Sequence, residues 1–194
     1  NIALQFAKNV AKHQNRVVRF TVIAQGSQAI DEWFHDSTKT DQITAAIRAA
    51  EIDSFDVILF RQGEENASQG NTEAAYALKV DTVFNAYRDS SWFGNSGKII
   101  LGGLNEQYHN TGVFDYYQHV NDPQKGGRGY VGVSVLGLSQ AAGIHQDGAT
   151  IDTVGARYYE AFAGQLKQNS LASTPNVSWY NDNSLLITPW STNL

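Results

Sequence analysis

Three residues in this sequence, Gly26, Gln62 and His145, have side chains or backbone groups that could support acyl-transfer chemistry. Each one comes after an apolar or β-branched segment. A glycine exposes its backbone N–H, a glutamine amide can donate to a developing oxyanion, and an imidazole can act as a general base. Together they are typical of a site that cleaves an acyl group. Singly, each also has an ordinary explanation: a turn glycine, a loop glutamine and a solvated histidine.

The spacing of apolar residues predicts helices that alternate with buried strands. The predicted helices are residues 2–13, 41–52, 72–88 and 153–167, and the predicted strands are residues 17–24, 56–60, 98–101 and 130–136. A polar, aromatic segment covers residues 105–122, and Leu185 to Ile187 could add a strand. This alternation predicts an α/β fold with a parallel central sheet, covered by helices on both faces. Sites in such sheets lie outside the carboxyl ends of the strands, where Gly26, Gln62 and His145 fall.

The composition narrows the class of protein. A length of 194 residues predicts one domain, and a net charge of −5 without a basic run argues against binding to nucleic acid. The absence of cysteine excludes disulfides and thiolate metal sites. No apolar run approaches the roughly 20 residues of a membrane span, so we expect no membrane partner. The polar composition would suit a secreted or virion-surface protein, such as a phage tail protein.

Four segments resemble motifs of the SGNH-hydrolase carbohydrate acetylesterases, which include sialate O-acetylesterase-like and acetylxylan-esterase-like proteins. They are Leu4 to Ala11, Ala24 to Trp33, Phe60 to Ala67 and Gly143 to Phe162. The segment Phe60 to Ala67 is the most specific match, because its Gln-Gly-Glu run resembles a "QGE" block of the family. The resemblance extends over about residues 2–168. We therefore expect an esterase-like domain over residues 1–170 and a C-terminal extension over residues 171–194.

The resemblance implies a fold and a set of roles. The fold would be a flavodoxin-like three-layer sandwich of the SGNH-hydrolase type. The backbone N–H of Gly26 and the side chain of Gln62 would form an oxyanion hole, with Gly63 in the same loop and Glu64 as a buttress. His145 would deprotonate a serine and later protonate the leaving alcohol. The substrate would be an O-acetylated carbohydrate, and the reaction would need no metal and no organic cofactor.

The chain departs from the family pattern at three positions. Arg61 replaces an aromatic residue. Ala142 replaces the aspartate that would orient His145, and in other triads the loss of this aspartate lowers kcat by about 10⁴-fold. Asp147 or Asp152 could orient the imidazole instead. The third departure is that no nucleophile motif is found before the first glycine loop.

The source of the nucleophile has two alternatives. Residues 1–7 look like the inside of a helix, so we expect that the chain begins within a domain and that the serine-bearing strand precedes it. Another segment or chain would then supply that strand and serine. The alternative nucleophile is Ser27, although it aligns better with a second glycine of the oxyanion loop.

Two other functions and two other clusters stay open at this point. The fold could be a catalytically impaired esterase that binds glycan or serves as a structural module, or a lipase or thioesterase of the same fold. His35 with Asp31, Glu32 and Asp36 could hold a metal, but their spacing is not diagnostic and a solvated helix end or loop is the favoured explanation. The residues of a Tyr-rich segment could line a sugar cleft or form a buried aromatic cluster; they are His109, His119, Tyr108, Tyr116 and Tyr117.

Overall fold

The computed structural model describes residues 2–33, 38–93, 97–120, 130–138, 140–142 and 145–164. The helices in this part are α1 (Ile2–Gln14), α2 (Thr38–Ala49), α3 (Glu64–Ser68), α4 (Glu73–Arg88), α5 (Gly112–His119) and α6 (Gly148–Ala163), with 3-10 helices η1 (Ile30–Trp33) and η2 (Glu106–Tyr108). The strands are β1 (Val57–Phe60), β2 (Lys98–Gly102), β3 (Val131–Val133), β4 (Gln140–Ala142) and β5 (His145–Gln146). No helix in these ranges is both long and apolar enough to span a membrane.

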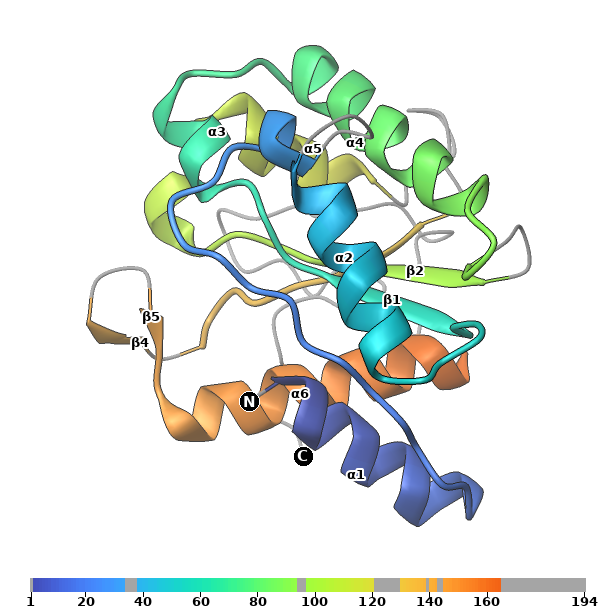
Figure 1. Cartoon of the computed structure of the whole chain (residues 1–194). Coiled ribbons are helices and arrows are strands. Elements are labelled where there is room, and N and C mark those ends of the chain that lie inside the picture. Colours follow the sequence, from blue (N-terminus) through green and yellow to red (C-terminus); the bar gives the residue numbers. More distant parts are fainter. Residues whose placement is uncertain are drawn as a thin grey trace.

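The central sheet is parallel, which confirms the predicted α/β fold. Its strand order is β1-β2-β3, and β2 pairs in parallel with both neighbours. Residues of β2 alternate between the two faces: Ile99 and Leu101 join one buried cluster, whereas Ile100 joins the other. The first cluster packs the sheet against α2, α4 and α5, and the second packs it against α1 and α6 (Figure 1). The molecule therefore has three layers.

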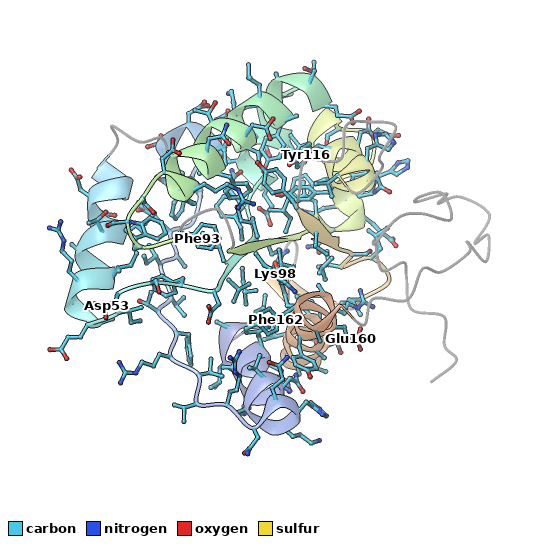
Figure 2. The ribbon with its side chains drawn as sticks, turned by 90° about the vertical axis from the view of Figure 1, so that its right-hand side faces the viewer. Asp53, Phe93, Lys98, Tyr116, Glu160 and Phe162 are labelled. Carbon is cyan, nitrogen blue, oxygen red and sulfur yellow. The ribbon has the colours of Figure 1, made fainter. Side chains whose placement is uncertain are left out.

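The two faces can be followed from a second direction. Figure 2 shows Tyr116 on one side of the sheet and Phe162 of α6 on the other. Lys98, the first residue of β2, donates to the backbone oxygen of Phe162 at 2.7 Å, and its Nζ lies 5.2 Å from the centre of the Phe162 ring. This contact joins the end of α6 to the amino-terminal edge of the sheet.

Helices α1 and α6 pack closely at a glycine. A Cβ atom added to Gly155 would lie 2.6 Å from Cβ of Gln5 and 3.0 Å from the backbone oxygen of Ile2. A residue with a side chain would push α1 away from α6. This packing is the physical reason for glycine in the Gly155-Ala156-Arg157 part of the motif that resembles the family.

The predicted buried strand over residues 17–24 is wrong. The described structure has no helix or strand there, and Val17, Phe20 and Val22 are 95%, 43% and 51% exposed. Figure 1 shows this blue segment running from α1 to η1. A β-branched run becomes a strand only when a neighbouring strand pairs with its backbone. In the described part of the chain β1 pairs with β2 alone, so this run has no such neighbour.

The predicted start of α4 agrees with the structure, whereas those of α5 and α6 were missed because their caps were not recognised. Helix α4 begins after Thr72, whose side chain accepts from the N–H of Ala75, as the prediction for residues 72–88 requires. Helix α6 begins at Gly148, well before the predicted residue 153, because Asp147 caps it. The polar segment 105–122 contains an unpredicted helix, α5, capped by Thr111. The predicted strand 130–136 shortens to β3, and Leu185 to Ile187 lie outside the described residues.

Candidate active site

The three loops that carry the predicted site residues lie at one end of the fold. β1 ends at Phe60 and leads through Gln62 into α3, and the turn at Gly26 leads into η1. His145 belongs to the antiparallel β4–β5 hairpin. Figure 1 shows α3, the loop before η1 and this hairpin at the left-hand end, where the parallel strands finish. The fold therefore places these loops where sites in α/β sheets usually form.

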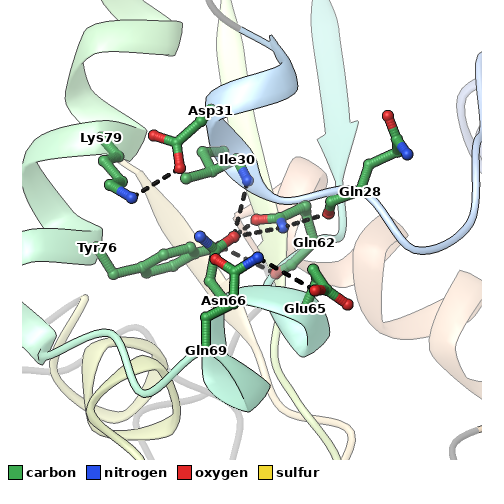
Figure 3. A network of polar contacts seen from close by, with 9 residues as sticks. All are labelled: Gln28, Ile30, Asp31, Gln62, Glu65, Asn66, Gln69, Tyr76 and Lys79. Carbon is green, nitrogen blue, oxygen red and sulfur yellow. Dashed lines mark hydrogen bonds and ion pairs between the residues drawn. The ribbon is translucent and has the colours of Figure 1, made fainter.

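Gln62 is buried, at 6% exposure, and every polar atom of its side chain has a partner. Its Nε2 donates to the backbone oxygen of Gln28 at 2.9 Å and to Oδ1 of Asn66 at 2.7 Å. Its Oε1 accepts from the hydroxyl of Tyr76 at 2.9 Å. An amide nitrogen carries two hydrogens, so both are used within the protein (Figure 3). Gln62 can donate to an oxyanion only after it releases one of these acceptors.

Asn66 and two tyrosines complete this network. Asn66 has no exposed surface, and its Oδ1 also accepts from the N–H of Ile30 at 2.7 Å. The hydroxyls of Tyr76 and Tyr117 lie 2.9 Å apart, and Tyr117 donates to the backbone oxygen of Gln62. Burial raises the pKa of both tyrosines well above the ordinary value. Both hydroxyls therefore stay protonated and able to donate at neutral pH.

Gly63 is the position in this loop that requires glycine. Its φ is +135°, outside the range that residues with a side chain normally adopt. A Cβ atom there would lie 2.9 Å from Cγ1 of Val113 and 3.1 Å from the hydroxyl of Tyr76. The turn after β1 is thus packed against the buried tyrosines, with no space for a methyl group.

Arg61 and Glu64 form an ion pair across the same turn. Nη2 of Arg61 lies 3.4 Å from Oε1 of Glu64, and both side chains are about a quarter exposed or less, at 22% and 26%. On the other side, Tyr158 of α6 donates to the backbone oxygen of Phe60 at 3.2 Å. Burial raises the pKa of Tyr158, while the nearby positive charge of Arg61 lowers it. The geometry suits Glu64 as a buttress of the loop.

The Gly26-Ser27 turn is open to solvent. Both residues are exposed, and a Cβ atom built on Gly26 would meet nothing within 4 Å. Ser27 has a φ of 55°, a left-handed conformation that glycine adopts without strain. This conformation fits a position where the family has glycine. It also fits a serine held in a strained turn, so backbone geometry alone is compatible with both roles of Ser27.

The hairpin register brings two predicted positions together. Ala142 of β4 is the direct pairing partner of His145 of β5. Asp147 follows at once and caps α6, because its Oδ1 accepts from the N–H of Thr150 at 2.7 Å. Asp152 is exposed on the second turn of α6. The carboxylate nearest to His145 in sequence thus already serves a helix N-terminus.

The structure describes the tyrosines of the predicted sugar cleft but only part of the predicted metal cluster. Tyr116 and Tyr117 are buried, and their rings pack against Tyr76 and each other at 5.1–6.0 Å between centres. These two rings belong to the buried aromatic cluster and are not available to stack on a sugar. Among the described residues no group of three or more His, Cys, Asp or Glu side chains could hold a metal. His35 and Asp36 of the proposed metal cluster lie outside the described residues.

A further buried cation supports the end of β3. Arg157 has no exposed surface, and its Nη1 donates to the backbone oxygen of Ser134 at 2.5 Å. Burial lowers the pKa of Arg157 to about 9, so it keeps its charge at neutral pH. A cavity of only about 10 Å³ is lined by Ser134, Val133, Gly103 and Tyr117 among others. That volume holds about one water molecule and excludes a sugar.

Sequence reasoning missed several residues that support this site. Asn66 and Arg157 lie inside the segments that resemble the family, at positions where a polar residue recurs in the motif, and that was the available signal. Tyr76 lies within a helical apolar pattern and carries no sequence signal of its polar role. Tyr117 was considered only as a wall of a sugar cleft or as part of an aromatic core.

The fold is a three-layer α/β sandwich, and the loops that carry the predicted site residues lie at the carboxyl ends of its strands. A family model described as "Carbohydrate esterase, sialic acid-specific acetylesterase" matches residues 1–164. The chain therefore belongs to this family of carbohydrate esterases. A search of curated proteins found no match.

We predict that Gly63→Ala destabilises the protein far more than Gly70→Ala. Both glycines have a positive φ, and each alanine therefore adds about 1–2 kcal/mol of backbone strain. Only Gly63 is also crowded by Val113 and Tyr76, and overpacking adds about 1–3 kcal/mol. Urea unfolding of the two variants measures the difference. Equal losses of unfolding free energy would show that the turn after β1 is not tightly packed.

Proposed function

We propose that this protein hydrolyses O-acetyl esters on carbohydrate by a serine-esterase mechanism. The observation that carries the proposal is the family match over residues 1–164. The segment most similar to the family, Phe60 to Ala67, also carries a buried hydrogen-bond network at the carboxyl end of the sheet. The description of the family makes acetylated sialic acid the first substrate to test. The sequence resemblance to acetylxylan-esterase-like proteins makes acetylated xylan the second.

In the proposed mechanism a serine hydroxyl attacks the acetyl carbonyl while His145 accepts its proton. Backbone N–H groups at Gly26 stabilise the oxyanion of the tetrahedral intermediate. The intermediate collapses as His145 returns the proton to the sugar oxygen, which leaves as an alcohol. Water then attacks the acetyl-serine with His145 again as base, and acetate and the free serine are regenerated.

Two sources of the serine fit the structure. Ser27 is exposed on the turn next to Gly26 and needs no further segment. The alternative is a strand from another segment or chain that pairs with the open edge of β1 and brings a serine to its carboxyl end. The exposed apolar side chains of Val17, Phe20 and Val22 favour the alternative, because such side chains are usually covered in the working protein.

A second function is favoured by one observation. Ala142, the pairing partner of His145, has no carboxylate, and Asp147 is already used as a helix cap. An imidazole without an orienting acid is a weak general base. The fold would then be an impaired esterase that binds acetylated glycan or acts as a structural module of a larger protein.

The proposal predicts acetate release that depends on His145. The chain is incubated with O-acetylated sialic acid, acetylated xylan and a chromogenic acetate ester, beside His145→Ala. We expect hydrolysis by the parent chain and a loss of about 10³-fold or more in the variant. Hydrolysis by both proteins at the same rate would refute His145 as the base. Hydrolysis by neither would rule out Ser27 as the nucleophile and show that this chain alone is not an active esterase.

Two substitutions at Ser27 identify the nucleophile in the same assay. Both substitutions remove the hydroxyl. Ser27→Gly also relieves the strain of the left-handed backbone conformation, whereas Ser27→Ala keeps that strain. If Ser27 is the nucleophile, both variants lose activity to the level of His145→Ala. If the serine comes from another segment or chain, Ser27→Gly keeps full activity.

We also predict that Ala142→Asp increases hydrolysis. A carboxylate at the position paired with His145 can hold the imidazole in the tautomer that accepts the serine proton. The expected gain in kcat is about tenfold or more, against the ~10⁴-fold that orienting acids contribute elsewhere. Ala142→Asn, which has the same size without the charge, is the control. No gain in Ala142→Asp would mean that His145 is oriented by another group.

A further inference from the structure

We propose that Tyr158 is a positioning residue for His145, because its hydroxyl ties α6 to the carboxyl end of β1. Helix α6 begins directly after the β4–β5 hairpin that contains His145. The inference rests on the proposed esterase function, in which His145 is the base. It predicts that a buried hydroxyl, away from the substrate, affects the rate of the reaction and not the binding of the ester.

The hydroxyl of Tyr158 is buried where α6 meets the end of β1. The residue is 1% exposed, and its hydroxyl donates to the backbone oxygen of Phe60, the last residue of β1, at 3.2 Å. Burial raises the pKa of Tyr158, while Arg61 and Glu64 in the turn after β1 lower and raise it, respectively. The hydroxyl therefore stays protonated at neutral pH, and its bond joins residues that are 98 positions apart in the sequence.

Strand β2 leaves room for this hydroxyl at its last residue, Gly102. A Cβ atom built on Gly102 would overlap the hydroxyl oxygen of Tyr158 and would lie 3.2 Å from its Cζ. The φ of Gly102 is not positive, so the backbone conformation does not require glycine. The close approach of Tyr158 is therefore the physical reason for glycine at the end of β2, beside the end of β1.

Both ends of the segment that carries His145 are attached to the same helix. The chain leaves β3, forms the β4–β5 hairpin and enters α6 (Figure 1). Next to Tyr158, the buried Arg157 donates to the backbone oxygen of Ser134, which directly follows β3. At the other end, Asp147 caps α6 two residues after His145. The position of α6 against the sheet therefore sets where the hairpin lies.

A hydrogen bond positions α6 more sharply than its apolar packing does. Val154 and the ring of Tyr158 belong to the buried cluster that packs α1 and α6 against the sheet, and apolar contacts have little directional preference. The hydroxyl adds one buried bond with a preferred length and angle. Ala142, the pairing partner of His145, has no carboxylate, so the position of the imidazole depends more on the backbone that carries it.

A double-mutant cycle tests the contact between Tyr158 and Gly102. Tyr158→Phe removes only the hydroxyl, and Gly102→Ala places a methyl group where that hydroxyl lies. In urea unfolding, we expect Gly102→Ala to raise the unfolding equilibrium constant about tenfold more in the parent chain than in Tyr158→Phe. If Gly102→Ala alone does not fold, folding of the double variant supports the same contact. Equal effects of Gly102→Ala in the two backgrounds would overturn the inference.

Ester hydrolysis and NMR test the positioning role, with Tyr159→Phe as the matched control. Tyr159 is the next residue of α6, and its ring stacks on that of His13 in α1 at 5.3 Å between centres. In hydrolysis of a chromogenic acetate, we expect Tyr158→Phe to lower kcat about tenfold or more with KM nearly unchanged, and the control to match the parent chain. We also expect the backbone amide signal of His145 to shift in Tyr158→Phe and to stay in place in the control.

These measurements separate the role of Tyr158 from the proposed function. A folded Tyr158→Phe that keeps the kcat of the parent chain, or that leaves the amide signal of His145 unchanged, would overturn the positioning role, whatever its stability. Lack of hydrolysis by the parent chain would instead count against the proposed function of this chain on its own. The amide signal of His145 would then decide whether Tyr158 holds the hairpin.

Discussion

One buried acceptor, Oδ1 of Asn66, joins two of the loops that form the candidate site. It receives the backbone N–H of Ile30 and the side-chain amide of Gln62, each at 2.7 Å, from two loops that are far apart in the sequence. Below it, Tyr76 and Tyr117 fix the same turn from α4 and α5. Because every one of these groups is buried, the loss of any partner leaves an unpaired polar atom in a dry environment. The turn after β1 and the loop before η1 therefore depend on one network.

This network fixes one half of the site, and the other half carries the proposed base. The rigid half comprises the turn after β1 and the loop before η1. The other half is the β4–β5 hairpin, where His145 pairs with Ala142 and where Asp147 is committed to capping α6. The half that contains Gln62, Gly63 and Glu64 favours an active enzyme, whereas Ala142 in the hairpin favours an impaired one. Membership of the carbohydrate esterase family is compatible with both, so the distinction depends on the hairpin and on the source of the serine.

Much of the fold followed from periodicity, but less of the site did. Helix α4 and strand β2 were predicted closely because their apolar spacing agrees with their caps and with their place in the sheet. The run over residues 17–24 was misread because strand formation needs a neighbour that local sequence does not reveal. Gln62 was found by residue type, but its buried partners Asn66 and Tyr76 were not predicted. Tyr76 could not be found, since a buried hydroxyl and a buried ring have the same spacing in a helix.

The most direct measurement is the exchange with water of the two side-chain amide protons of Gln62, observed by NMR at neutral pH. The account requires both protons to be donated to Gln28 and Asn66 inside the protein. It therefore predicts two separate, slowly exchanging signals, of which the proton donated to Asn66 loses its protection in Asn66→Ala. Rapid exchange of either proton in the parent chain, as in an exposed glutamine, would contradict the account.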